Sequence, residues 1–237
     1  MIKIQKINLQ VGDGTTMQAY VSMPEGKGIF PAVIVLQEAF GVNSHIRNIT
    51  DRIAKEGYVA IAPELFHRTA EPGFEIAYTV DFSVIMPHFQ TMTTENISAD
   101  IKAAYDWLQK QNNVKHEKIG SIGFCLGGRA AFIANADLPL SAAISFYGGR
   151  TDALADKAKT LHAPHLFFWG GLDTHITKEQ INTVINAVKA ANKPYTNVII
   201  SDAKHGFNCD ERASYNKQAA NEAWAMSMAF FKNKLGE

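Results

Sequence analysis

The chain has 237 residues, 46% of them hydrophobic, and its 23 Lys and Arg residues balance 23 Asp and Glu residues. This length and apolar content fit one domain, residues 1–237, with a substantial buried core. The balanced charge and the absence of a basic block argue against surfaces for nucleic acid or for an anionic membrane. We therefore expect a small-molecule partner. The sequence leaves open whether the chain is a monomer or a homodimer.

The amino-terminal pattern and the small number of cysteines indicate a cytoplasmic protein. Residues 2–10 alternate apolar and polar side chains, unlike a signal peptide, and no run of about 18 apolar residues is present. The two cysteines, Cys125 and Cys209, provide neither a disulfide framework nor a multi-cysteine metal spacing. We expect no bound metal, and two thiols that stay unbridged in a reducing compartment.

The first part of the chain predicts an antiparallel hairpin followed by buried strands and a helix. A turn at Gly12, Asp13 and Gly14 separates two alternating segments, and the run 32–36 is apolar throughout, as in a strand covered on both faces. The expected elements are strands 2–10, 17–23, 32–36 and 58–62, with a helix at 45–56 capped by Asn43 or Ser44.

Residues 66–93 interrupt this pattern. They carry Pro72, Gly73, Pro87 and several aromatic residues without a clear period. We interpret this segment as a lid or pocket insertion.

Regular alternation of strands and helices resumes after the insertion. The expected strands are 118–122, 142–147, 165–169 and 196–200, and the expected helices are 97–111, 129–134, 178–191 and 216–234. Such alternation predicts an α/β fold with a mostly parallel, doubly wound sheet and the hairpin at its edge. Reactive loops of these sheets gather at the carboxyl ends of the strands.

The most informative motif is Gly123-Phe124-Cys125-Leu126-Gly127-Gly128, between a predicted strand and a predicted helix. A glycine-flanked sharp turn in this context holds a nucleophile out of the backbone. A lone cysteine is more often a small buried hydrophobe, but the turn favours a reactive Cys125.

Asp173 and His205 each follow the carboxyl end of a later predicted strand. The order nucleophile, acid, histidine is the order found in α/β-hydrolases. His205 would accept the thiol proton, and Asp173 would orient the imidazole. By itself Asp173 also fits a turn or a helix cap before Thr177.

Besides the three side chains, hydrolysis requires an oxyanion hole, a pair of N–H donors that stabilise the developing negative charge. The backbone N–H of Leu126 follows the nucleophile, and we expect a second donor, the N–H of Ala39, from the loop after strand 32–36. Losing one such donor costs roughly 3 to 4 kcal/mol of transition-state stabilisation.

Four segments together resemble the dienelactone hydrolase (carboxymethylenebutenolidase) family over nearly the whole chain. They are Gln37-Glu38-Ala39-Phe40-Gly41-Val42-Asn43, the motif around Cys125, Gly170-Gly171-Leu172-Asp173 and His205-Gly206-Phe207. The resemblance implies an α/β-hydrolase fold, a Cys125-Asp173-His205 triad, and lactone or ester hydrolysis through a thioester without a cofactor. It also implies that Glu38 helps to convert the thiol to thiolate when substrate binds.

The chain departs from the family pattern where the substrate carboxylate is held. Family members that cleave dienelactone use two arginines, one before the elbow and one four residues after the catalytic histidine. Here the second position is Cys209, and residues 69–94 contain no arginine, although Arg68 and Arg212 are nearby in sequence.

Two other functions therefore stay open: a broad carboxylesterase for small neutral esters, and a non-hydrolytic protein that binds a ligand or senses oxidants through Cys125. The candidate substrate contacts are side chains of the site loops and of the insertion, each of which also fits a core or solvated role: Phe40, Phe124, Phe207, His67, Arg68 and His88.

Overall fold

The structure is a computed structural model that describes residues 1–236, apart from the side chain of residue 82. Its internal contacts divide the chain into two compact units, Met1–Ile119 and Gly120–Glu237. The expectation of a single domain stays a prediction.

The first unit contains the predicted hairpin at the edge of its strands. β1 (Ile2–Gln10) pairs antiparallel with β2 (Thr16–Pro24), and β2 pairs antiparallel with β4 (Val59–Pro63). β4 in turn pairs parallel with β3 (Phe30–Leu36), whose last five residues are buried, as expected for a strand covered on both faces.

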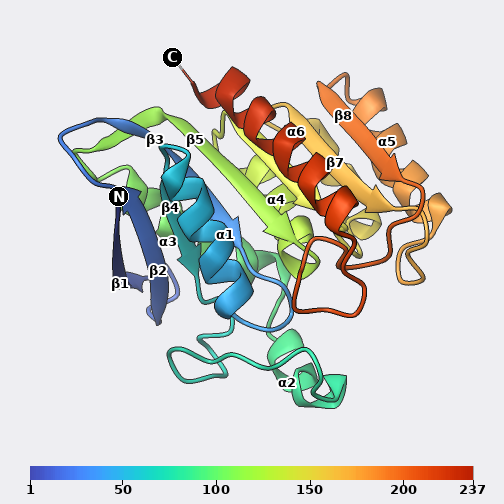
Figure 1. Cartoon of the computed structure of the whole chain (residues 1–237), viewed down its shortest axis with the longest axis horizontal. Coiled ribbons are helices and arrows are strands. Elements are labelled where there is room, and N and C mark those ends of the chain that lie inside the picture. Colours follow the sequence, from blue (N-terminus) through green and yellow to red (C-terminus); the bar gives the residue numbers. More distant parts are fainter. Residues whose placement is uncertain (237) are drawn as a thin grey trace. The chain divides into compact units, whose positions relative to one another are not determined.

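Helix α1 (Ser44–Lys55) covers these strands because its apolar residues form one stripe. Ile46, Ile49 and Ile53 are fully buried, and the helix lies across β3 and β4 in Figure 1. The Asn43 side chain caps the helix by accepting a hydrogen bond from the Ile46 N–H at 3.2 Å. Of the two caps considered from the sequence, Asn43 is therefore the one used.

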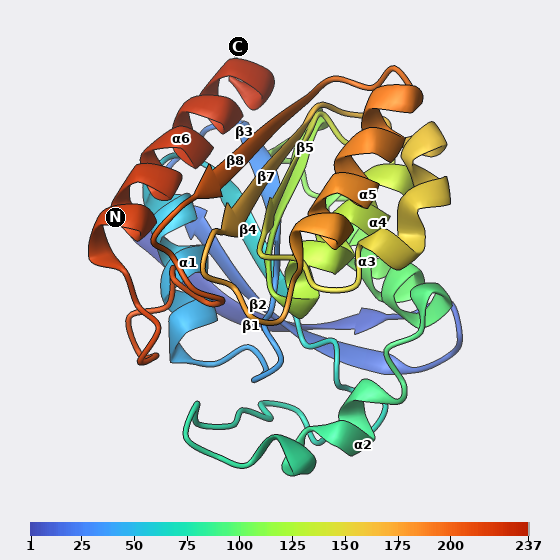
Figure 2. The ribbon, with the colours of Figure 1, turned by 90° about the vertical axis from the view of Figure 1, so that its right-hand side faces the viewer.

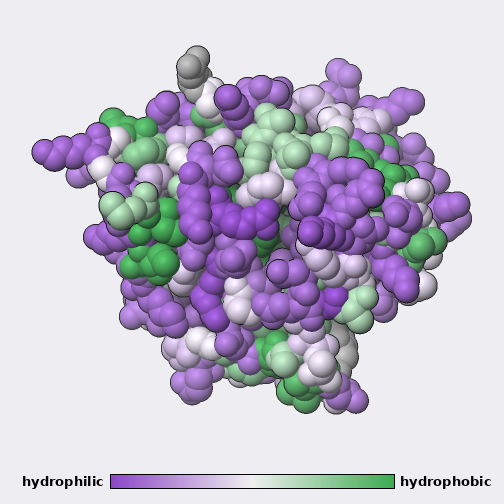
Figure 3. Space-filling view, in the orientation of Figure 1, coloured by the Kyte–Doolittle hydropathy of each residue, from purple (hydrophilic) through white to green (hydrophobic). Residues whose placement is uncertain are grey.

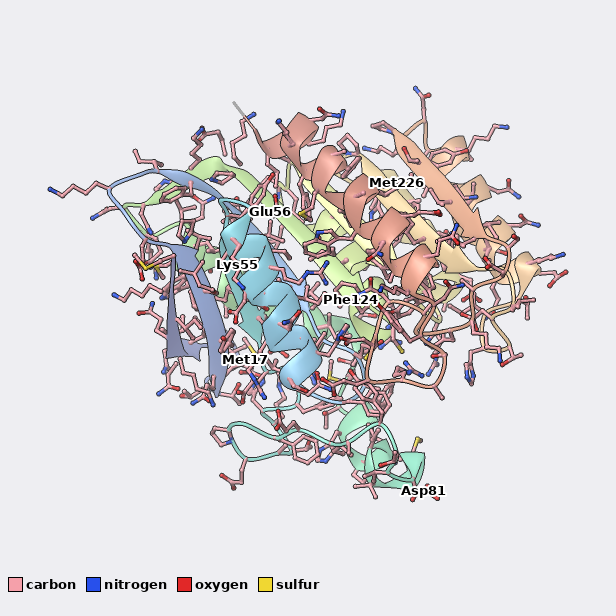
Figure 4. All side chains as sticks on the ribbon, viewed as in Figure 1. Met17, Lys55, Glu56, Asp81, Phe124 and Met226 are labelled. Carbon is pink, nitrogen blue, oxygen red and sulfur yellow. The ribbon has the colours of Figure 1, made fainter. Side chains whose placement is uncertain are left out.

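The predicted insertion is irregular, as expected, but holds two short helical segments. These are η1 (Phe82–Val84) and α2 (Met86–Phe89), and Figure 4 labels Asp81 just before them. The segment touches the loop after β3 through one antiparallel bridge, Gly41 with Glu75. Gly41 is required there, because its φ is +83° and an added Cβ would overlap the carbonyl oxygen of Phe74.

Helix α3 (Thr94–Leu108) follows the insertion and begins three residues earlier than predicted. The cause is Thr93, whose side chain accepts a hydrogen bond from the Asn96 N–H at 3.2 Å and so starts the helix. The polar first turn carries no apolar period, so the sequence pattern revealed the helix only from Ile97 onward.

The second unit contains a run of parallel strands. β5 (Val114–Phe124) leads into it and is followed in the sheet by β6 (Ala142–Phe146), β7 (His165–Gly170) and β8 (Tyr195–Ile200). Together with the first unit this confirms the expected α/β fold, with mostly parallel strands and an antiparallel N-terminal hairpin at the edge.

Helices cover both faces of these strands. Figure 2 shows α6 (Lys217–Leu235) on one face and α4 (Leu126–Asp137) with α5 (Lys178–Ala190) on the other. A further segment, η2 (Asp152–Thr160), packs against α5 and α4 and was not predicted from the sequence.

The face of the molecule in Figure 3 is mostly hydrophilic, with apolar side chains in small separate groups. Within residues 1–236, no helix combines the length and apolarity needed to cross a membrane.

Candidate active site

Cys125 occupies a sharp turn between the end of β5 and the start of α4. Its backbone has φ 54° and ψ −112°, a conformation that side-chain-bearing residues rarely adopt. The turn is held by the Cys125 N–H, which donates to the Phe146 carbonyl at 3.0 Å, and by the Gly128 N–H, which donates to the Cys125 carbonyl at 3.0 Å. The predicted elbow is therefore present, and Cys125 is partly exposed.

The flanking glycines are explained by close backbone approach. A Cβ on Gly123 would overlap the carbonyl of Gly127, and a Cβ on Gly128 would lie 2.6 Å from the carbonyl oxygen of Phe146. Larger residues at either position would push the first turn of α4 away from β5 and β6. The glycine spacing of the motif thus reflects sterics as well as turn geometry.

Asp173 lies in the turn after β7 and is fixed on both of its oxygens. Oδ1 accepts the N–H of His175 at 2.7 Å and the N–H of Ile176 at 3.2 Å, while Oδ2 accepts a hydrogen bond from Nδ1 of His205 at 2.8 Å. The Asp173 side chain is 1% exposed. Burial would raise the pKa of Asp173, but these hydrogen bonds and the charge of His205 lower it.

His205 follows β8, and its Nδ1 lies 2.8 Å from Oδ2 of Asp173. Burial alone would lower the pKa of His205, but hydrogen bonds to Asp173 and Cys125, and their charges, raise it to about 10. The ring is therefore protonated at neutral pH when both partners are ionised. Of the three side chains that the sequence singled out, Asp173 and His205 are joined by a hydrogen bond, and Cys125 contributes to the raised pKa of His205. Their joint role as a triad stays a prediction.

Two aromatic rings beside His205 were not found by sequence reasoning. Tyr147 is fully buried, has φ 38°, and its ring centroid lies 5.1 Å from that of His205. His175 makes an edge contact with His205, also with centroids 5.1 Å apart. The only sequence signal for Tyr147 was its place before Gly148-Gly149, and His175 was considered only as a competitor of His205.

The remaining site residues expected from the sequence lie partly in the second unit, next to Cys125, and partly in the first unit. Leu126 is the first residue of α4, where an amide has no acceptor within the helix. Glu38, Ala39 and Phe40 follow β3 in the first unit and are 0%, 2% and 8% exposed. Their roles stay predictions.

The candidate contacts from the insertion form hydrogen bonds with other residues of the first unit. Arg68 donates two hydrogen bonds to the buried carboxylate of Asp100, at 2.8 and 2.9 Å, and a third to Asp13 at 2.8 Å. His67 bonds to Thr15 Oγ1 at 2.9 Å through Nε2.

His88 bonds through Nδ1 to Thr69 Oγ1 at 2.8 Å. Phe124 and Phe207, in the second unit, are fully buried among other rings, and Figure 4 labels Phe124 at the end of β5. Substrate contact by any of these residues stays a prediction, as does the absence of a bound metal.

Comparisons with known proteins place the chain among the hydrolases. A family model described as "Dienelactone hydrolase family" matches residues 17–235. A Synechocystis protein named "Putative carboxymethylenebutenolidase" is 38% identical over 252 residues, covering 99% of this chain and 96% of the relative. An Escherichia coli K12 protein of the same name is 35% identical over 238 residues, covering 94% of this chain and 85% of the relative.

A solved structure shows the same similarity in three dimensions. The crystal structure titled "Putative Dienelactone Hydrolase" from Klebsiella pneumoniae has a TM-score of 0.87 and 32% identity, covering 98% of each chain. The fold, the elbow and the comparisons define a hydrolase of the α/β-hydrolase class. More narrowly, the chain belongs to the dienelactone hydrolase family, and the expected enzyme class, a carboxylic-ester hydrolase, is confirmed.

Proposed function

We propose that this chain hydrolyses a lactone or small ester in the cytoplasm through a Cys125-His205-Asp173 triad and a thioester intermediate. The observation that carries the proposal is the 2.8 Å hydrogen bond from Nδ1 of His205 to the buried carboxylate of Asp173, in the same unit as the sharp turn that holds Cys125. Cys125 also contributes to the raised pKa of His205. An imidazolium stabilises a thiolate beside it, and a thiolate is the nucleophilic form of cysteine.

The reaction proceeds in two steps. In the first, the Cys125 sulfur bonds to the carbonyl carbon, the C–O bond to the leaving alcohol breaks, and His205 gives its proton to the leaving oxygen. In the second, water attacks the thioester while His205 takes up its proton, and the acid leaves as the C–S bond breaks. Asp173 keeps the imidazole in the tautomer that both steps need.

The developing oxyanion is stabilised by two backbone amides in this proposal. The Leu126 N–H is the first donor, because it begins α4 directly after the nucleophile. We propose the Ala39 N–H as the second donor and Glu38 as the group that assists thiolate formation, both on the basis of sequence resemblance. Glu38→Gln tests the latter: it should slow alkylation of Cys125 in the presence of a substrate analogue.

The substrate class has a second candidate, small neutral esters. Two observations favour this candidate. The guanidinium of Arg68 already forms hydrogen bonds with Asp100 and Asp13. Cys209, which stands at the position of the second carboxylate-binding arginine of the family, is uncharged and fully buried. Arg212 is the cation nearest in sequence to His205 among the arginines, and its guanidinium packs against Gly206, where an added Cβ would lie 2.6 Å from Cζ.

Rates on a neutral lactone and on its carboxylated analogue separate the two substrate classes. A preference for the carboxylated compound that is lost in Arg212→Gln supports a carboxylate-binding hydrolase. Equal or better rates on the neutral compound support the carboxylesterase.

Mass spectrometry of the intact protein after mixing with an activated ester tests the chemistry itself. An acyl group on Cys125 is expected. Reversible oxidation of Cys125 without any acyl adduct would instead indicate a redox sensor.

A further inference from the structure

A buried series of hydrogen bonds beneath α4 is used by no step of the proposed reaction. Ser145 Oγ donates to the carbonyl oxygen of Gly128 at 2.6 Å and lies 2.8 Å from Nε2 of His165. On the other side of the ring, Nδ1 of His165 lies 3.1 Å from Nδ2 of Asn135. The three side chains of this relay, Ser145, His165 and Asn135, are at most 1% exposed.

The hydrogen positions of the relay follow from its ends. The hydroxyl of Ser145 donates its only proton in the hydrogen bond to the Gly128 carbonyl, so its oxygen must accept the hydrogen bond from Nε2–H of His165. Nδ1 of His165 is then unprotonated and accepts from Asn135. Burial lowers the pKa of His165 to about 3, so this neutral tautomer persists at physiological pH.

The relay spans α4 from its first turn to its last. Asn135, near the C-terminal end of α4, donates to the Ala163 carbonyl at 2.9 Å and accepts the Ala163 N–H at 2.8 Å. Gly128, at the other end, lies in the turn whose N–H groups return to the Cys125 carbonyl. Strands β6 and β7, which carry Ser145 and His165, thus fix both ends of the helix that starts at the elbow.

The hydrogen bond from Ser145 to the Gly128 carbonyl lies close in the chain to the proposed oxyanion donor, the Leu126 N–H. Gly128 is two residues from Leu126, and its N–H bonds to the Cys125 carbonyl at 3.0 Å. The Cys125 backbone is in a rare conformation, which persists only where its surroundings fix it. The Gly128 carbonyl shares its peptide group with the Arg129 N–H, which donates to the Cys125 carbonyl at 3.3 Å. That carbonyl shares its peptide group with the Leu126 N–H, so a shift of the Gly128 carbonyl would reorient the Leu126 N–H, whereas the sulfur lies on a side chain outside this peptide group.

We propose that Ser145 and His165 are positioning residues for the oxyanion-binding turn, acting through the Gly128 carbonyl. This inference rests on the proposed function, because it assigns the Leu126 N–H to the transition state. The proposal predicts different effects on two measurable properties of the site, the reactivity of the thiol and the rate of ester hydrolysis. Alkylation of the thiol by iodoacetamide needs no oxyanion hole, whereas ester hydrolysis does.

The test compares Ser145→Ala with the matched control Ser227→Ala. Ser227 is also fully buried in the second unit, and its hydroxyl donates to a helix carbonyl, that of Ala223, at 2.7 Å. Ser145→Ala should lower kcat on an activated ester about tenfold or more, with KM and the rate of Cys125 alkylation within about twofold of wild type. Ser227→Ala should leave all three kinetic quantities unchanged.

Substitutions of His165 provide a second comparison. His165→Gln keeps an N–H donor for Ser145 and should retain most of kcat, whereas His165→Leu removes the donor and should resemble Ser145→Ala. If His165→Leu does not fold, the Ser145→Ala result decides alone. Equal kcat in Ser145→Ala and Ser227→Ala, or a parallel fall of kcat and alkylation rate, would overturn the proposal.

Hydrogen exchange keeps this inference separable from the proposed function. In Ser145→Ala, peptides covering 126–129 should exchange about tenfold faster than in wild type, because a buried hydrogen bond to this turn is lost. If these peptides exchange faster in Ser145→Ala but the wild-type protein hydrolyses no ester, the proposed function is refuted and the anchoring of the turn by Ser145 still holds. Unchanged exchange would refute the anchoring itself.

Discussion

The carboxylate of Asp173 connects the turn after β7 to the ring of His205. Its Oδ1 accepts two backbone N–H groups from that turn, and its Oδ2 lies 2.8 Å from Nδ1 of His205. The orientation of the imidazole is therefore determined by backbone geometry, through a side chain that is almost fully buried.

Asp173→Asn should lower kcat by about 10³-fold or more while the fold is kept. The amide oxygen would stay on the backbone N–H groups of His175 and Ile176, which leaves the NH₂ group facing His205. That donor favours the tautomer with a proton on Nε2, so the ring could no longer accept the proton of Cys125. Stopped-flow kinetics and near-ultraviolet circular dichroism check both parts.

Asp202→Asn is the control for this experiment. Asp202 lies in the loop after β8, is exposed, and accepts a hydrogen bond from Asn216 at 3.3 Å. The kcat of the Asp202→Asn variant should equal that of wild type. Wild-type turnover in Asp173→Asn would remove Asp173 from the proposed triad.

Stability should depend on pH through His205. The pKa of His205 is raised in the folded protein to about 10 from its ordinary value of 6.5, so between these values the folded state binds more protons than the unfolded state. The stabilisation is fully present below about pH 6.5 and is lost as pH rises through about 10.

Urea denaturation of wild type and His205→Gln measures this contribution. The difference in the free energy of unfolding between the two should shrink steadily as pH rises above 6.5. A difference that stays constant from pH 6 to pH 10 is inconsistent with a raised pKa.

Tyr147 should support the protonated form of His205. The centroids of the two rings lie 5.1 Å apart with their planes tilted by 58°, a distance at which an aromatic ring attracts a cation by about 1 kcal/mol. Tyr147→Leu should lower the pKa of His205 by less than one unit and reduce kcat, whereas Tyr147→Phe, which keeps the ring, should change the pKa little. NMR titration of the His205 ring proton is the measurement, and equal shifts in both variants would argue against a ring effect.

Arg68→Met should destabilise the protein by about 3 kcal/mol, because it leaves the buried carboxylate of Asp100 without its cation. KM should change less than twofold if the ion pairs of Arg68 are its main role. A raised KM with little loss of stability is the result that the sequence-based interpretation, a substrate contact, predicts. Chemical denaturation and steady-state kinetics on the same preparation distinguish the two.

The sequence was sufficient for features that depend on local pattern. The apolar stripe of α1, the glycine-flanked turn at Cys125 and the strand ends before Asp173 and His205 are all visible as short-range regularities. Chain order then restricted the topology, because parallel strands place their following loops at the same end.

Features that depend on contacts between distant segments were not predictable in this way. Arg68 and Asp100 are 32 positions apart, and Ser145 and His165 are 20 apart on neighbouring strands. Nothing in local composition distinguishes a histidine that bonds to a buried serine from one in a pocket. The positive φ of Tyr147 was likewise missed, because a bulky aromatic residue rarely adopts it.

Titration of the enzyme with iodoacetamide tests the central claim, that the Cys125 thiolate is the nucleophile. Alkylated protein is digested to measure the modified fraction of Cys125 and of Cys209, and turnover of an activated ester is measured on the same samples. Activity should fall in direct proportion to the modification of Cys125, while Cys209, which is fully buried, stays unmodified. Undiminished turnover after complete alkylation of Cys125 would contradict the account.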